Sequence, residues 1–204
     1  MRITKYFKSV KLLYRPISNL VDMEEIRNIE EFYLQLRKLS PAHLGSKTLD
    51  LGCGQKPRNP FAADTVFGID IGNIDIPNVI KADISQSPIP FEDASMDYIT
   101  AFDFIEHVPR VIYLPTIRLP FIELMNEIYR VLKPGGIFLA HTPVYPFSAS
   151  FTDPTHVNPV TSETFSLYFD DQRKWGAMYG FKGSFNIKRQ ILFQTHLLTV
   201  MQKV

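Results

Sequence analysis

Cysteine is almost absent from the sequence: Cys53 is the single cysteine among 204 residues. One thiol can form neither an intramolecular disulfide nor a cysteine-rich zinc site. Disulfide-free chains are typical of reducing compartments, so we predict a cytoplasmic protein.

Long apolar runs are also missing. A secretory signal needs about 7–15 continuous apolar residues and a membrane span about 20, so we expect neither. Residues 1–20 instead carry basic residues and no acidic ones, with apolar residues between them at helical spacing: Arg2, Lys5, Lys8, Lys11 and Arg15 are the basic set. We interpret this segment as a helical cap on the domain, with contact to a membrane surface as the alternative.

An excess of charge of one sign is the third absence. The chain has 22 basic and 21 acidic residues, a net charge of +1, and therefore no field that would attract a nucleic-acid backbone. Its 45% apolar and 21% charged residues are ordinary for a globular protein. The length predicts a single domain over 1–204, with a helical cap at 1–45 and a lid or substrate-binding insertion at 143–180.

Short apolar runs alternate with helical patterns along the chain. We expect strands at 47–51, 65–71, 78–82, 96–104, 137–141, 185–193 and 195–200, longer helices at 22–39 and 116–132, and short helices at 162–168 and 172–179. Pro57 and Pro60 fall in the first crossover, so a helix there must be short or distorted. The pattern predicts an α/β fold: a doubly wound, mostly parallel, seven-stranded Rossmann-like sheet with an antiparallel C-terminal edge strand.

The first strand runs into the turn Gly52-Cys53-Gly54. Glycines there allow a sharp turn and let a ligand lie against the main chain. A dinucleotide site would need a third glycine near position 57, where the chain has Pro57, which lacks a backbone N–H. The loop therefore favours a nucleoside without a pyrophosphate.

Acidic residues stand at three successive strand ends: Asp50, Asp70 and Asp83. Each alone is better explained as a cap or turn residue. Asp70 lies where a carboxylate accepts hydrogen bonds from both ribose hydroxyls. Asp83 is placed to accept from an adenine amino group, with the backbone N–H of Ile84 available to a ring nitrogen. Together with the glycine turn, the three carboxylates predict a nucleoside site.

Five segments in this order resemble class I S-adenosylmethionine-dependent methyltransferases, of the group described as type 11 methyltransferase domains: LDLGCG, FGID, KADI, FDFIEHV and RVLKPGG. The resemblance implies S-adenosyl-L-methionine as cofactor, with S-adenosyl-L-homocysteine as its product. It places Asp50 and Gly52 near the methionine part, and Phe102 and Asp103 on the side of methyl transfer. The full cofactor-binding set is Asp50, Gly52, Cys53, Gly54, Asp70, Ile71, Asp83, Ile84, Phe102 and Asp103.

Methyl transfer from a sulfonium requires alignment and exclusion of water, and a base only when the acceptor begins protonated. The candidate catalytic residues are His156, Asp153, His107 and His141. We favour His156, because residues 153–156 lie in a proline-rich loop that would close over the strand ends. Each of these histidines has a structural role as its alternative. The spacing of His141, Asp153 and His156 matches no metal signature, so we expect no metal.

The substrate is the least determined feature of the sequence. Aromatic residues are frequent in 143–180, which favours a small molecule with a flat or apolar face, such as a sugar or a hydroxylated metabolite. Core packing explains the same aromatics. Nucleic-acid methylation is disfavoured, because the fourth strand is not followed by an Asn/Asp-Pro-Pro-Tyr/Phe segment. Protein methylation, aminopropyl transfer and a non-catalytic cofactor-binding or interaction module remain alternatives.

Overall fold

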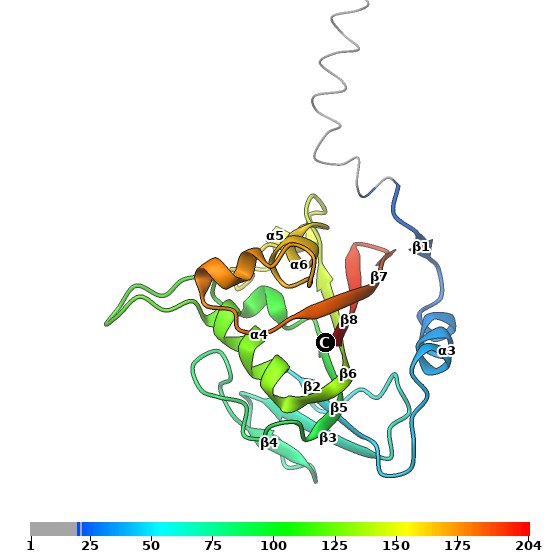
Figure 1. The fold of residues 1–204 in the computed structure, drawn as a ribbon. Helices are drawn as coiled ribbons and strands as arrows, with labels where there is room; N and C mark the ends of the chain where they lie inside the picture. Colours follow the sequence, from blue (N-terminus) through cyan, green and yellow to red (C-terminus); the bar gives the residue numbers. More distant parts are fainter. Residues whose placement is uncertain (1–19, 21) are drawn as a thin grey trace, which may run out of the picture.

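In the described part of the chain, the strands form one eight-stranded sheet in the order β1-β7-β8-β6-β5-β2-β3-β4 (Figure 1). The structure, a computed structural model, describes Leu20 and residues 22–204. The basic segment interpreted above as a helical cap therefore lies outside the described residues, except for Leu20. The strands are β1 Glu25–Ile26, β2 Lys47–Leu51, β3 Thr65–Asp70, β4 Val79–Lys81, β5 Met96–Phe102, β6 Leu132–Pro143, β7 Phe185–Phe193 and β8 His196–Lys203.

The predicted fold class is confirmed, with one extra strand. β5, β2, β3 and β4 pair in parallel, and β6 joins β5 in parallel. β8 runs antiparallel to both β6 and β7, so the antiparallel strand lies between them, while β7 and β1 form the edge beyond it. The eighth strand is β1, a two-residue segment inside the range expected to be helical.

Two helices cover opposite faces of the sheet: α3, Ile29–Leu39, and α4, Pro120–Val131. α3 begins at Ile29, later than expected, because Asn28 caps it through Glu30 N at 2.9 Å and the residues before it pair with β7. α4 begins at Pro120, a residue well suited to the first helical turn. The shorter helices are η1 Ile105–His107, α5 Ala149–Thr152, α6 Thr164–Tyr168 and η2 Trp175–Tyr179.

Each face of the sheet has its own apolar core. On the α3 face, Phe32 and Leu36 pack with Tyr98 and Phe102 of β5. The crossover between β2 and β3 forms no helix at all, although its two prolines predicted a short or distorted one. The ring of Phe61 from that crossover stacks on Tyr98 at 4.3 Å. The other face packs against α4 through a larger cluster. The sheet is therefore held between two layers, and its strand ends are left open to ligands.

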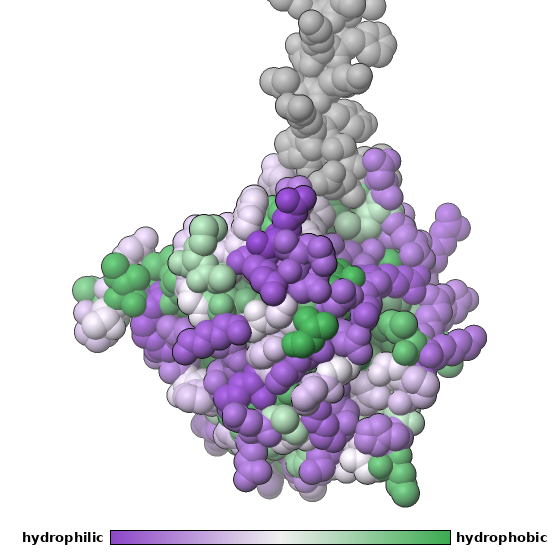
Figure 2. Space-filling model, in the orientation of Figure 1, coloured by the Kyte–Doolittle hydropathy of each residue, from purple (hydrophilic) through white to green (hydrophobic). Residues whose placement is uncertain are grey.

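The loop between η1 and α4 projects from the body of the molecule (Figure 1). An isolated bridge between Ile112 and Arg118 closes it into a hairpin. Apolar side chains gather on this projection (Figure 2), where Tyr113, Leu114 and Ile117 are each at least 70% exposed. Among the described residues, no helix has the length and apolar character needed to cross a bilayer.

Candidate active site

The glycine turn after β2 has the conformation that its sequence predicts. Gly52 and Gly54 have φ of +66° and +54°, in the left-handed region that disfavours other residues. A Cβ at Gly52 would lie 2.6 Å from Cδ2 of Phe104, whereas a Cβ at Gly54 would meet no atom within 4 Å. Gly52 is therefore required by close packing as well as by conformation.

Asp70 ties this turn to the end of β3. Its Oδ2 accepts a hydrogen bond from Gly54 N at 2.8 Å, and its Oδ1 accepts one from Gly72 N at 2.8 Å. A carboxylate has about four lone-pair sites, so each oxygen keeps the capacity to accept from a ligand hydroxyl. Asp70 is thus held in place and still able to bind a ribose.

A cleft of about 280 Å³ lies at the carboxyl ends of β2 to β5. Six residues of the expected cofactor-binding set line it: Gly52, Asp70, Ile71, Asp83, Ile84 and Asp103. Ser85 donates to Asp83 Oδ1 through its hydroxyl at 2.6 Å, and this bond is the main reason that the pKa of Asp83 lies below its ordinary value. The carboxylate is therefore ionised at the wall of the cleft and able to accept hydrogen bonds.

The other four residues of that set do not line this cleft. Gly54 contributes to the cleft indirectly, because its N–H donates a hydrogen bond to Asp70. Cys53 lines a separate groove beside α3. Phe102 is buried under the guanidinium of Arg58, at 4.6 Å from the ring centroid.

Asp50, the fourth, is 1% exposed and accepts hydrogen bonds from Thr100 Oγ1 and Arg58 N. Burial raises the pKa of Asp50 to about 6, although these two hydrogen bonds oppose the increase. Asp50 therefore stabilises the loop after β2 from its buried side, through the bond to Arg58 N.

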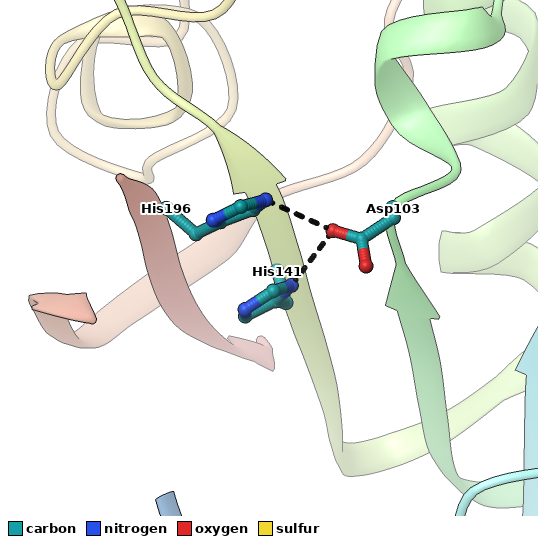
Figure 3. A group of neighbouring side chains, drawn as sticks. All are labelled: Asp103, His141 and His196. Atoms are coloured by element: carbon teal, nitrogen blue, oxygen red, sulfur yellow. Dashed lines mark hydrogen bonds and ion pairs between the residues drawn. The ribbon is translucent and has the colours of Figure 1, made fainter. Parts of the chain in front are cut away.

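Asp103 joins two histidines from different strands (Figure 3). Its Oδ1 lies 3.0 Å from Nδ1 of His141 and 3.2 Å from Nε2 of His196. Burial alone would raise the pKa of Asp103, but the hydrogen bonds from both imidazoles outweigh it and hold the pKa well below its ordinary range. The residue has φ of +51°, which turns the chain sharply after β5.

The carboxylate fixes how the two rings carry their protons. An ionised carboxylate only accepts, so each ring nitrogen that faces it carries a hydrogen. A neutral His141 is then protonated at Nδ1 and has its lone pair at Nε2. His196 is protonated at Nε2, and its Nδ1 accepts from Thr195 Oγ1 at 3.2 Å. An imidazole oriented by a carboxylate in this way is the arrangement of a general base.

A second group brings His107 and His156 together, with ring centroids 4.8 Å apart. His107 lines the cleft, whereas Nδ1 of His156 is buried and has no hydrogen-bond partner among the described residues. Among the described residues, Asp153 forms no hydrogen bond or ion pair with either imidazole. Its Oδ1 accepts a hydrogen bond from Thr155 Oγ1 at 2.7 Å. Thr155 Oγ1 in turn lies 2.9 Å from Nδ1 of His107.

Glu106 completes this second group. It is 2% exposed, its Oε2 accepts from Thr142 Oγ1 at 2.8 Å, and burial raises the pKa of its carboxyl above the ordinary value. Its backbone oxygen accepts from Val157 N and Asn158 N, at 2.9 and 3.0 Å. These bonds attach the 153–158 loop to η1. The loop expected to act as a lid is therefore hydrogen-bonded to η1 at its C-terminal end.

Sequence reasoning assigned no role to three residues of these groups. His196 is on the same face as His141 because His141 pairs with Leu198, two positions away, in the antiparallel register of β6 and β8. Glu106 and Thr155 join through the contact between η1 and the 153–158 loop. None of these pairings follows from spacing along the chain.

The cleft suits the nucleoside part of S-adenosylmethionine. The close approach at Gly52 exposes main chain, Asp70 and Asp83 are acceptors for ribose and adenine, and the apolar side chains of Ile71 and Ile84 provide flat surfaces. With these acceptors at the strand ends and an α/β sheet of this order, the molecule has the architecture of a class I methyltransferase.

The family to which this architecture points is confirmed by comparison. A family model described as a methyltransferase domain, of type 11, matches residues 49–140. Residues 49–140, a little under half of the chain, therefore match a class I S-adenosylmethionine-dependent methyltransferase domain of this type, and S-adenosylmethionine is the cofactor of that class.

Relatives of known name are similar over part of their length. A "probable S-adenosylmethionine-dependent methyltransferase" of Mycolicibacterium smegmatis is 29% identical over 117 residues, which are 52% of this chain and 42% of the relative. A demethylmenaquinone methyltransferase of Staphylococcus saprophyticus is 25% identical over 80% of this chain and 67% of its own. A sterol 24-C-methyltransferase of Schizosaccharomyces pombe is 27% identical over 46% of this chain and 27% of its own. The chain thus spans less than half the length of two of these relatives.

Solved structures agree on the fold. A methyltransferase from Archaeoglobus fulgidus superposes with a TM-score of 0.53 at 19% identity, covering 86% of this chain and 95% of its own. The [4+2]-cyclase SpnF has a TM-score of 0.57 at 13% identity, covering 95% of this chain and 94% of its own. At these identities the similarity concerns the fold alone.

Proposed function

We propose that the protein transfers a methyl group from S-adenosylmethionine to a small molecule that carries a hydroxyl and a flat or apolar face. The observation that carries this proposal is the cleft in which Asp70, Asp83 and Gly52 meet. Asp103, the carboxylate bonded to His141 and His196, lines the same cleft. Sugars and hydroxylated metabolites belong to this substrate class. So do ring compounds of the kind that the names of the sterol and demethylmenaquinone relatives indicate.

Two grooves lined partly by residues of the 143–180 region offer space for an acceptor. One groove of about 270 Å³ is walled by Phe121, Tyr168 and Tyr179, and a neighbouring one of about 430 Å³ by Tyr145 and Phe151. Arg110 and Tyr168 line both grooves, which therefore form adjacent parts of one surface. Aromatic walls with a few polar groups are typical of small-molecule sites.

The cofactor would supply an electrophilic methyl group on a sulfonium that is already a good leaving group. The remaining task of the chain is to align the acceptor, exclude water and, for a hydroxyl, accept a proton. Asp103 orients His141 so that Nε2 carries the lone pair, and this nitrogen is the atom we assign to the proton. His156, favoured from sequence, lies in the second group instead.

The test begins with calorimetric titration of the purified chain with S-adenosylmethionine and S-adenosylhomocysteine. We expect both to bind at micromolar concentration. A screen of sugars, sterols, quinols and phenols for release of S-adenosylhomocysteine then identifies the acceptor class. A folded protein that binds neither compound would overturn the proposal.

Variants separate catalysis from binding. His141→Gln should reduce turnover at least tenfold and leave the affinity for S-adenosylhomocysteine unchanged. His43→Gln is the matched control, because this exposed histidine also contacts an aspartate, Asp97, but at the opposite end of the sheet. Binding of the cofactor without its consumption by any acceptor would favour a non-catalytic module, or a different reaction in the same fold.

A further inference from the structure

Glu106, His107 and His156 each offer one ligand atom, and these atoms all lie within 4.8 Å of one another. We infer that the three side chains bind a divalent transition-metal ion beside the cleft. The family match assigns no such site, and no metal was expected from the sequence. Four structural features support it.

The first feature is a buried oxygen that has no hydrogen-bond partner in the described part of the chain. Glu106 is 2% exposed, and its Oε2 is bonded to Thr142, but its Oε1 has no hydrogen-bond partner among the described residues. A buried polar atom without a partner costs roughly 1–3 kcal/mol, more if charged. A cation at Oε1 would remove this cost and neutralise the carboxylate.

The second feature is the proton on His107. Thr155 donates its hydroxyl hydrogen to Asp153 Oδ1 at 2.7 Å, so its oxygen is left to accept from Nδ1 of His107 at 2.9 Å. His107 is therefore protonated at Nδ1 and has its lone pair at Nε2. Metal-binding histidines are oriented by such a bond from the other ring nitrogen.

The third feature is His156, whose Nδ1 is buried without a partner. Its ring stands at 79° to that of His107. Lone pairs lie in the ring planes, so two rings at this angle can direct them to one point. Ligand atoms about 2.1 Å from a tetrahedral ion are roughly 3.4 Å apart. The three ligand atoms here lie within 4.8 Å of one another, and rotation of the exposed His107 side chain can shorten these distances.

The fourth feature is the contrast with Asp103, His141 and His196, the other group of three possible ligands. There the two rings are stacked at 9° with centroids 4.5 Å apart, and one nitrogen of each ring bonds to the same carboxylate oxygen. All the facing atoms are already joined by hydrogen bonds. That group is satisfied without an ion, whereas the Glu106 group is not.

Two imidazole nitrogens and one carboxylate oxygen suit Zn²⁺, Fe²⁺, Mn²⁺ or Co²⁺ and leave coordination positions open. Because His107 lines the cleft, an ion on it would lie at the cleft wall. An open position there would take the acceptor's oxygen and lower the pKa of its hydroxyl. This role for the ion, unlike its binding, rests on the proposed function.

Zinc titration of the metal-free, tag-free protein tests the site. After dialysis against a chelator, we expect one Zn²⁺ per chain by calorimetry. Glu106→Gln and His156→Gln should each weaken its binding at least tenfold. Thr155→Val keeps all three ligands and removes the bond that orients His107, and it should also weaken binding about tenfold. His43→Gln and His141→Gln should bind Zn²⁺ as the parent protein does.

Titration of the same metal-free preparations with S-adenosylhomocysteine shows whether each variant is folded and separates this proposal from the proposed function. If Glu106→Gln does not fold, the exposed positions decide through His107→Gln and Thr155→Val. The inference is overturned if Zn²⁺ does not bind, or if binding is lost in His141→Gln and retained in His107→Gln. Retained affinity for S-adenosylhomocysteine in that case would leave the proposed function intact.

Discussion

Asp50 and Thr100 face each other across β2 and β5, and Asp50 Oδ1 accepts the hydroxyl hydrogen of Thr100 at 2.7 Å. Both residues are buried, at 1% and 0% exposure. The other oxygen of Asp50 accepts from Arg58 N, in the crossover that replaces a helix. One buried carboxylate therefore joins two central strands to the segment that follows the glycine turn.

Removing this buried charge should change how stability depends on pH. The pKa of Asp50 is about 6 in the folded chain, above the ordinary value of 3.8, so the folded state binds more protons between these values. This carboxyl therefore makes the free energy of unfolding fall by about 2–3 kcal/mol as the pH rises from 4 to 7. In Asp50→Asn that fall should be absent.

Urea unfolding of parent and variant at pH 4.5, 5.5 and 7 measures the difference. Asp75→Asn, an exposed aspartate on the loop after β3, is the control and should follow the parent. Identical pH dependence in Asp50→Asn and the parent protein would refute this account of Asp50.

The two glycines of the turn should respond differently to alanine. At either position, alanine in the left-handed conformation costs about 1–2 kcal/mol. Gly52→Ala also forces Cβ against Phe104, a wall of the cleft, so it should cost at least 1 kcal/mol more than Gly54→Ala. Thermal unfolding gives the stabilities, and calorimetry should show the larger loss of S-adenosylhomocysteine affinity in Gly52→Ala. Equal effects at both positions would mean that the contact with Phe104 is unimportant.

Asp70→Ala should weaken binding of S-adenosylhomocysteine at least tenfold. The change removes charged acceptors, each worth about 1.5–3 kcal/mol, and releases the Gly54 N–H that holds the turn. Asp75→Ala should leave the affinity unchanged. Calorimetric titration of both variants decides, and an affinity within twofold of the parent for Asp70→Ala would remove Asp70 from the site.

Asp103→Asn should destabilise the protein by about 0.5–1 kcal/mol at neutral pH, a small value because the carboxylate is 47% exposed. The folded-state pKa of Asp103 is depressed, so its contribution is present above the ordinary pKa and is lost as the pH falls below about 4. Unfolding midpoints of variant and parent should therefore differ at pH 6, and the difference should be smaller at pH 3. A constant difference at both pH values would show that the ion pairs with His141 and His196 do not contribute.

Much of the fold and of the cofactor cleft followed from sequence because those signals are local. Glycines in a turn, acids at strand ends and the alternation of strand and helix are each written within a few residues. Parallel strands then bring Asp70 and Asp83 to one edge of the sheet without further information. The same reasoning could not determine which way Asp50 faces, because the alternation of side chains along a buried strand allows either face.

The amino-acid sequence by itself determined the glycine turn, the strand ends and the class of cofactor. Only the tertiary structure decided the partners of the histidines. His196 joins Asp103 because β8 enters between β6 and β7 in one particular register. His107 joins Thr155 because η1 is hydrogen-bonded to the 153–158 loop. Such contacts depend on packing between segments distant in the chain, which local preferences do not encode.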